Sequence, residues 1–139
     1  MLDAEILDKL VIAAADARKR AYAPYSKFTV GAAVMSAGGR IFTGCNIENV
    51  SFGATVCAER VAMFSAVAAG YRDLVAIAIT GPGESPIAPC GICRQVMGEL
   101  APDAMVIMVA EGGARETSSV AELLPRAFAP DELVGPRQD

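Results

Sequence analysis

The 139-residue sequence contains no histidine and no tryptophan, and it has no excess of positive charge. Without histidine the chain lacks the commonest general base and the commonest metal ligand, so acid–base chemistry must rest on Glu, Asp, Cys, Lys or Tyr. Its formal net charge is −4, and its longest basic cluster is Arg18-Lys19-Arg20. Because phosphate backbones are bound by clustered Lys and Arg, this charge favours a small-molecule ligand over a nucleic acid.

Long apolar runs are also missing, since no stretch approaches the roughly 20 residues that a membrane helix requires. The first residues, Met1 to Glu5, are acidic where a secretory signal would be basic, so we expect a cytoplasmic protein without a membrane partner. Hydrophobic residues nevertheless make up 53% of the chain and charged residues only 20%. A small monomer exposes too much surface for this composition, so we expect subunit interfaces that cover part of it.

Hydrophobic periodicity and turn residues predict one domain, residues 1–139, with a loosely held tail at 135–139. The predicted helices cover 3–21, 57–69, 91–100 and 119–124, and the predicted strands cover 28–36, 41–48, 74–80 and 105–110. Apolar runs without alternation, such as 74–80, are typical of strands covered on both faces. Strands interleaved with helices predict an α/β fold, a three-layer α/β/α sandwich around a mixed central sheet.

Two short motifs carry the chemistry, Cys57-Ala58-Glu59-Arg60 and Pro89-Cys90-Gly91-Ile92-Cys93. Both lie at predicted helix starts, where free N–H groups and a partial positive charge favour the thiolates that zinc requires. Three sulfur ligands would leave the fourth position of a tetrahedral zinc open for water. Glu59, two residues past Cys57, can then stand beside the metal and carry protons.

Other interpretations of these motifs stay open. A Cys-x-x-Cys pair alone is also typical of redox sites and structural zinc sites, and a glutamate in a first helical turn often only complements the helix dipole. A structural site would need Cys45 as its fourth ligand. Strand alternation groups Cys45 with Ile41 and Thr43, which predicts a buried apolar filler instead.

Cys-x-Glu followed by Pro-Cys-x-x-Cys resembles the signature of the zinc deaminases of nucleosides and nucleobases. A closer resemblance to the small homotetrameric cytidine deaminases covers most of residues 20–130. It includes the stretches 21–28, 30–33, 44–49 and 123–125. The resemblance implies a cytidine deaminase-like catalytic domain that hydrolyses cytidine and 2′-deoxycytidine to their uridine counterparts and ammonia, in pyrimidine salvage. A related small-molecule enzyme, such as blasticidin S deaminase, is the alternative.

The resemblance also assigns roles at the two motifs. Cys57, Cys90 and Cys93 would hold one Zn²⁺ per subunit. Hydroxide on that metal would attack C4 of the base while Glu59 shuttles protons. Arg60 would donate hydrogen bonds to ligand sulfurs and offset their charge, although it could also be an ordinary surface arginine.

The substrate would contact residues outside the motifs as well. By resemblance, Asn46 and Glu48 would hold the 3′-hydroxyl of the ribose, and the backbone N–H of Ala58 would meet the base. Phe28 would pack along the pyrimidine, although it could equally be a core residue.

Two further aromatic positions bear on assembly. Phe128 resembles a residue that enters a neighbouring subunit's site, so the active sites of a homotetramer would be shared between subunits. Phe52 stands where related chains carry tyrosine. A phenolic hydrogen bond near the sugar would therefore be missing, with lower affinity or a shifted preference as the result.

Overall fold

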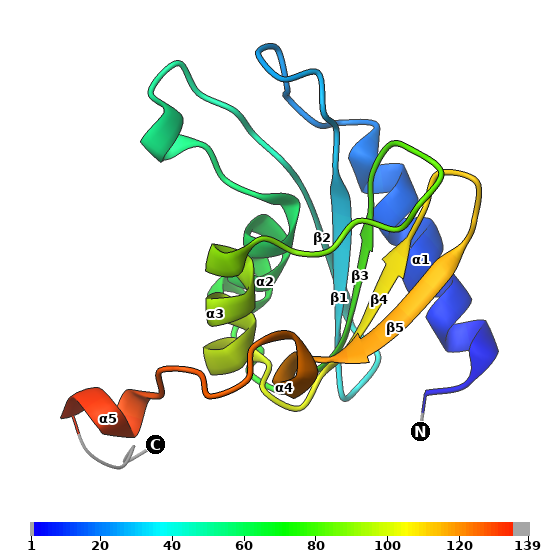
Figure 1. The fold of residues 1–139 in the computed structure, drawn as a ribbon. Coiled ribbons are helices and arrows are strands. Elements are labelled where there is room, and N and C mark those ends of the chain that lie inside the picture. Colours follow the sequence, from blue (N-terminus) through cyan, green and yellow to red (C-terminus); the bar gives the residue numbers. More distant parts are fainter. Residues whose placement is uncertain (1, 135–139) are drawn as a thin grey trace.

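A computed structural model of the chain describes residues 2–134 (Figure 1). Its helices are α1 (Ala4–Arg18), α2 (Ala58–Ala68), α3 (Gly91–Leu100), α4 (Val120–Leu123) and α5 (Pro130–Val134), with a short 3₁₀ turn η1 (Phe52–Ala54). Its strands are β1 (Gly31–Ser36), β2 (Ile41–Cys45), β3 (Leu74–Thr80), β4 (Met105–Val109) and β5 (Arg115–Ser119). They form one sheet in the order β2-β1-β3-β4-β5. Only β3 and β4 pair in parallel, so the sheet is mixed as predicted.

Helices cover both faces of this sheet, which confirms the three-layer α/β/α prediction (Figure 1). On one face, Leu10 of α1 shares a core with Ala33 of β1. On the other face, Met63 of α2 and Met97 of α3 share a second core with Val34. Ala33 and Val34 are neighbours in β1, and the alternation of a strand sends their side chains to opposite faces.

The start of α2 lies directly on β2 at Gly44. A Cβ atom at this position would come within 2.5 Å of the Ala58 carbonyl oxygen and of the Ala62 nitrogen. Both atoms belong to the helix backbone, which cannot rotate away as a side chain could. Glycine is therefore required here, and the close contact fixes the first turn of α2 against the sheet.

The hairpin strands are shorter than predicted, because residues 28–30 and 46–48 lie outside β1 and β2. The side chain of Asn46 explains the difference. Its amide oxygen accepts from the Val30 nitrogen at 2.8 Å, and its amide nitrogen donates to the Phe28 carbonyl at 2.7 Å. A side chain thus takes backbone groups that a continued ladder would have used.

Other boundaries agree more closely with the prediction. The helix predicted to end at residue 21 ends at Arg18, and residues 19–21 continue as tight backbone turns. The strand predicted over 105–110 ends at Val109. Gly70 follows α2 with a φ of +95°, the left-handed conformation that ends a helix most easily in glycine.

Three elements were not predicted, namely β5, α5 and η1. The β5 sequence, Arg-Glu-Thr-Ser-Ser, has no apolar alternation, because this strand pairs only with β4 at the sheet edge and its first residues are exposed. The other two elements are too short to show a hydrophobic period. The predicted tail at 135–139 lies outside the described residues.

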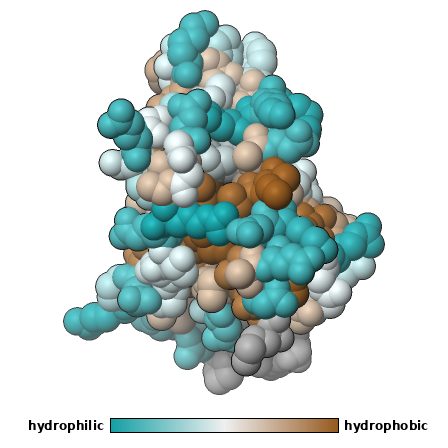
Figure 2. Space-filling view, turned by 90° about the vertical axis from the view of Figure 1, so that its right-hand side faces the viewer, coloured by the Kyte–Doolittle hydropathy of each residue, from teal (hydrophilic) through white to brown (hydrophobic). Residues whose placement is uncertain are grey.

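Large hydrophobic side chains remain exposed on two loops that project beyond the same end of the sheet (Figure 1). They are Tyr22, Tyr25, Phe28, Ile47, Val50 and Phe52. On the face shown in Figure 2, hydrophobic residues also reach the surface between hydrophilic ones. None of the helices in the described part of the chain is long and apolar enough to span a membrane.

Candidate functional site

Three cysteine sulfurs meet where α2 and α3 begin. Cys57 is the N-cap of α2, Cys90 is the N-cap of α3, and Cys93 lies in the first turn of α3. Their Sγ atoms all lie within 4.8 Å of one another, and those of Cys57 and Cys90 are 3.6 Å apart. Zn–S bonds of about 2.3 Å put two thiolates of a tetrahedral site roughly 3.8 Å apart, so the spacing suits one zinc ion. Across residues 2–134, no other group of three Cys, His, Asp or Glu side chains converges in this way.

Cys45 does not join this cluster. Alternation along β2 places it on the side of Ile41, which packs against the α1 core, whereas the three sulfurs lie at the α2 and α3 side of the sheet. Its side chain is half-buried, so the prediction of a buried filler is only partly right. A zinc site with four cysteines does not fit this geometry.

The pKa values of Cys57 and Cys93 are shifted in opposite directions. A hydrogen bond with the Cys93 thiol, together with the Arg60 guanidinium, lowers the pKa of Cys57 to about 5 although burial opposes it. The same bond to Cys57, and burial, raise the pKa of Cys93. A metal ion bound here would displace any thiol proton, because zinc takes cysteine as the thiolate.

Arg60 lies against the cluster, so the interpretation as a free surface arginine is wrong. Its Nη2 donates to Cys57 Sγ at 3.4 Å, and this bond raises the pKa of Arg60. Its Nε is buried and has no hydrogen-bond partner among residues 2–134. The guanidinium supplies positive charge beside sulfurs that would carry about three negative charges on a metal. Donor type, spacing and charge compensation all fit a zinc ion.

Glu59 is only 4% exposed and lies beside the sulfurs. Burial raises the pKa of its carboxyl, and the charge of Cys57 adds to this, while a bond from its own backbone N–H and one from Cys93 oppose it. A buried carboxyl with a raised pKa can hold and release a proton near neutral pH. The helix backbone on either side of Glu59 lies directly against Gly44.

A pocket of about 340 Å³ opens above the sulfurs. Its lining comprises Ser26, Phe28, Val30, Asn46, Glu48, Thr55, Val56, Cys57, Ala58, Glu59, Ile87, Ala88 and Cys90. This volume suits a small metabolite, and the apolar walls with a few converging polar groups are typical of ligand sites. Phe28 is 44% exposed and lines the pocket, so its interpretation as a core residue is wrong.

Asn46 and Glu48 line the pocket but also hold the loop before β1. Asn46 donates to the Phe28 carbonyl at 2.7 Å. Glu48 accepts from the backbone nitrogens of Tyr25 at 2.9 Å and Ser26 at 3.1 Å, and from the Ser26 hydroxyl. The Ser26 hydroxyl is the main reason that the pKa of Glu48 is lowered. Sequence reasoning missed Ser26, although a serine within a turn after proline is a signal of side-chain to backbone bonding.

A short backbone link joins the two ends of the pocket. Ile47, which separates Asn46 from Glu48, exchanges two hydrogen bonds of 3.0 Å each with Val56. Val56 immediately precedes Cys57 in the chain. The polar pair and the first cysteine are therefore held together without any intervening side chain.

The two remaining aromatic candidates lie outside this pocket. Phe52 is 78% exposed and meets the edge of the Tyr25 ring, with the two centroids 6.4 Å apart. It lines an adjoining hollow of about 420 Å³ that shares Ser26, Glu48 and Thr55 with the pocket. Phe128 is 56% exposed, and its carbonyl accepts from the Gln95 amide at 2.9 Å. Neither ring reaches the sulfurs of its own chain.

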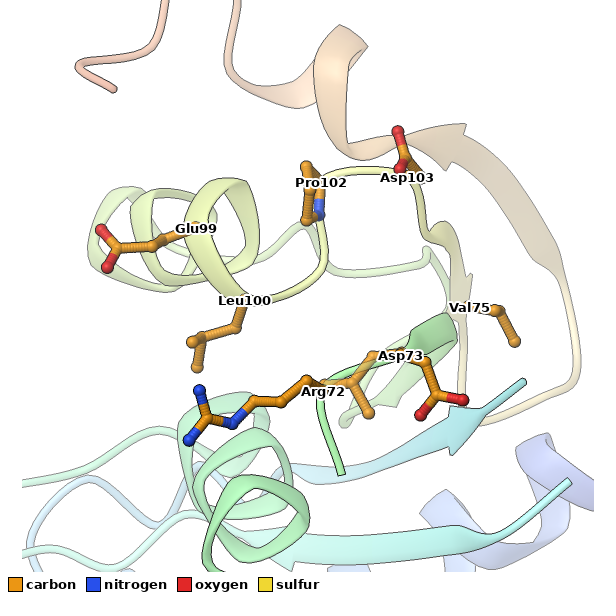
Figure 3. Close-up of a pocket in the computed structure, with 8 residues that line it drawn as sticks. Arg72, Asp73, Val75, Glu99, Leu100, Pro102 and Asp103 are labelled. Carbon is orange, nitrogen blue, oxygen red and sulfur yellow. The ribbon is translucent and has the colours of Figure 1, made fainter. Parts of the chain in front are cut away.

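Another pocket, of about 400 Å³, lies where β3 begins and α3 ends (Figure 3). Arg72, Asp73, Glu99 and Asp103 surround it with charges of both signs. It contains none of the cysteines and none of the residues predicted for a site. The residues predicted for a catalytic site gather at the cysteine pocket instead.

Comparison with known proteins adds independent evidence. Residues 4–109 match the family model described as the cytidine and deoxycytidylate deaminase zinc-binding region. The chain is 44% identical over 128 residues to the cytidine deaminase of Sporosarcina psychrophila, covering 91% of this chain and 94% of that one. It is 47% identical over 125 residues to the cytidine deaminase of Halalkalibacterium halodurans, covering 89% and 95%.

A solved structure extends the agreement to the fold. The crystal structure of cytidine deaminase from Burkholderia pseudomallei superimposes with a TM-score of 0.85 at 52% identity, covering 87% of this chain and 98% of that one. The cysteine cluster, which can hold a metal ion, lies inside the segment that matches the zinc-binding model. The chain therefore belongs to the family of zinc-binding cytidine and deoxycytidylate deaminases.

Proposed function

We propose that the protein catalyses the hydrolytic deamination of cytidine and 2′-deoxycytidine to uridine and 2′-deoxyuridine, with release of ammonia. One observation carries the proposal. A cluster of three sulfurs and a buried carboxyl lie at one end of a pocket whose other end holds Asn46 and Glu48. The groups suited to hold a metal and the groups suited to bind a sugar hydroxyl thus line the same pocket.

Cys57, Cys90 and Cys93 would hold the zinc ion. When bound, zinc supplies a Lewis acid that makes water a nucleophile near neutral pH. Glu59 takes a proton from the attacking water and delivers it to N3 of the pyrimidine. It then carries the second proton of that water, from the new hydroxyl on C4, to the amine that leaves. C4 becomes a carbonyl, so one water is consumed and one ammonia is released. Arg60 withdraws charge from the sulfur of Cys57.

Other residues orient the nucleoside. The backbone N–H of Ala58, in the first turn of α2, has no acceptor within the helix and would meet the base. Phe28 packs along the pyrimidine ring. Asn46 and Glu48 together offer a donor and an acceptor to the 3′-hydroxyl of the ribose.

We also propose a cytoplasmic homotetramer of single-domain chains that acts in pyrimidine salvage. The exposed rings of Phe52 and Phe128 support shared active sites, because a neighbouring subunit would cover them and complete the pocket. The four free cysteines support a reducing compartment.

A substrate panel tests the activity. Purified zinc-loaded protein is followed by the ultraviolet change of the pyrimidine ring with cytidine, 2′-deoxycytidine, cytosine, cytidine monophosphate and blasticidin S. We expect both nucleosides to be deaminated with the highest kcat/KM. Preference for blasticidin S or for cytosine would contradict the proposed substrate, and inactivity on the whole panel would contradict the reaction.

A further inference from the structure

We propose that Ser26 is a positioning residue that couples recognition of the ribose to the placement of Phe28 along the base. The inference rests on the proposed function of the cysteine pocket. It adds a residue to which neither the sequence motifs nor the family resemblance gave a role. Ser26 lines the pocket between the two residues that it would couple.

The hydroxyl of Ser26 forms the middle of a hydrogen-bond chain. The backbone N–H of Phe28 donates to Ser26 Oγ at 3.0 Å. The Ser26 hydroxyl in turn donates to Oε2 of Glu48. Successive hydrogen bonds polarise one another. A new hydrogen bond to the Glu48 carboxylate therefore changes the strength of the bond between Ser26 Oγ and the Phe28 N–H.

The other backbone polar group of Phe28 is held from the same side of the pocket. Its carbonyl accepts from Asn46 Nδ2 at 2.7 Å. Both polar groups of this residue are thus tied to Asn46 and Glu48, one directly and one through Ser26. The residues suited to hold a sugar hydroxyl are therefore also those that fix the aromatic ring.

The backbone conformation of Lys27, between Ser26 and Phe28, shows why the bond from the Phe28 N–H to Ser26 Oγ is needed. Its φ is +63°, a left-handed conformation that costs a residue with a side chain about 1 kcal/mol. The bond from the Phe28 N–H to Ser26 Oγ closes a turn across Lys27 and stabilises it. Without the hydroxyl, Lys27 can relax and Phe28 loses its position.

The carboxylate of Glu48 has room for a ligand as well. An ionised carboxylate offers about four acceptor sites. Three donors from the loop occupy it, namely the backbone nitrogens of Tyr25 and Ser26 and the Ser26 hydroxyl. About one site is left for a substrate hydroxyl, so the sugar and the loop share one group.

Kinetics of Ser26→Ala with two substrates test the proposal. The substrates are cytidine and 2′,3′-dideoxycytidine, which lacks the hydroxyl that would reach Glu48. We expect Ser26→Ala to raise KM for cytidine about tenfold, the effect of losing one hydrogen bond to a charged group, with kcat changed less. The ratio of kcat/KM for cytidine to that for dideoxycytidine should fall at least about threefold. A displaced Glu48 carboxylate weakens binding only of cytidine, because dideoxycytidine has no hydroxyl for it to bind.

Two further variants frame this result. Ser26→Thr keeps the hydroxyl and should restore both the KM and the substrate ratio. Ser85→Ala removes the hydroxyl of an exposed loop serine that does not line the pocket, and it should behave as wild type. An unchanged ratio of the two kcat/KM values in Ser26→Ala would overturn the coupling. A merely structural role would lower kcat/KM for both substrates by the same factor.

Stability is checked by zinc content and Tm. If Ser26→Ala unfolds, Ser26→Cys takes its place, because a thiol is a weak donor at the same position. An intermediate substrate ratio in Ser26→Cys supports the coupling, and a wild-type ratio contradicts it. Inactivity of the wild-type enzyme on both nucleosides would instead overturn the proposed function.

Discussion

The two ends of the pocket are built by different means. At the sulfur end, Cys57 and Cys90 begin helices that pack against the sheet, and Gly44 lets the α2 backbone rest on β2. At the other end, the loop before β1 is held by side chains, chiefly Asn46 and Glu48. Regular elements thus fix the groups that we propose to react, and side-chain hydrogen bonds fix those that we propose to recognise the substrate. Substitutions at the sulfur end should therefore abolish activity, whereas those at the loop end should tune it.

The largest effect is expected for Cys93→Ala. Loss of one of three sulfur ligands should reduce zinc to well below one ion per chain and remove detectable deamination. The Tm should fall too, because the metal ties α2 to α3. Zinc analysis by atomic absorption and a thermal scan measure both effects.

Cys45→Ala is the matched control for this variant, since Cys45 lies outside the cluster. It should retain zinc and activity. Wild-type zinc content in Cys93→Ala, or zinc loss in Cys45→Ala, would contradict the ligand set.

Glu59→Gln should separate chemistry from metal binding. The amide cannot carry protons, so kcat should fall by about 10² to 10⁴ while zinc content stays at the wild-type level. Glu116→Gln, at an exposed carboxyl on β5, serves as the control and should keep full activity. Near-normal turnover in Glu59→Gln would rule out this residue as the proton carrier.

Gly44→Ala tests whether the helix contact with the sheet is what makes the sulfur end rigid. The added methyl would press on the backbone of Ala58 and Ala62, which should cost about 1–3 kcal/mol and lower Tm by roughly 5–10 °C. Activity should drop with it, because Glu59 moves with α2. Gly38→Ala, where a Cβ meets nothing within 4 Å, should change neither Tm nor activity. Equal melting temperatures in the two variants would show that the contact between α2 and β2 at Gly44 does not determine the stability of the sulfur end.

The smallest effect is expected for Phe52→Tyr at the loop end. A phenol here would supply one more hydrogen bond near the sugar, so KM for cytidine should fall by about twofold to fivefold with kcat unchanged. Phe64→Tyr adds the same hydroxyl to an exposed ring on α2 and should leave KM alone. A rise in KM for Phe52→Tyr would mean that its ring packs against an apolar neighbour instead.

The contrast between the two ends also explains what the sequence could predict. Cys57, Glu59, Cys90 and Cys93 lie at helix starts, and short-range spacing with apolar periodicity is enough to place such groups. Asn46 was expected on a continuing strand, but its amide ends that strand by bonding to the loop before β1. No local pattern contains this long-range bond. The turn after Pro24 could have indicated the local bond of Ser26 to Phe28, but the role proposed for Ser26 also depends on a carboxylate from a separate segment.

The backbone pairing of Ile47 with Val56 has a consequence for ligand choice. Those two hydrogen bonds fix the backbone separation between Glu48 and Cys57. In the proposed function, they would set the distance between the groups that hold the sugar and those that act on C4. If the proposed function holds, a nucleoside lengthened by one methylene between base and sugar should be a poorer substrate, because its C4 and its hydroxyl no longer match this separation. On this proposal, molecular length as well as polarity would limit which cytosine compounds are accepted.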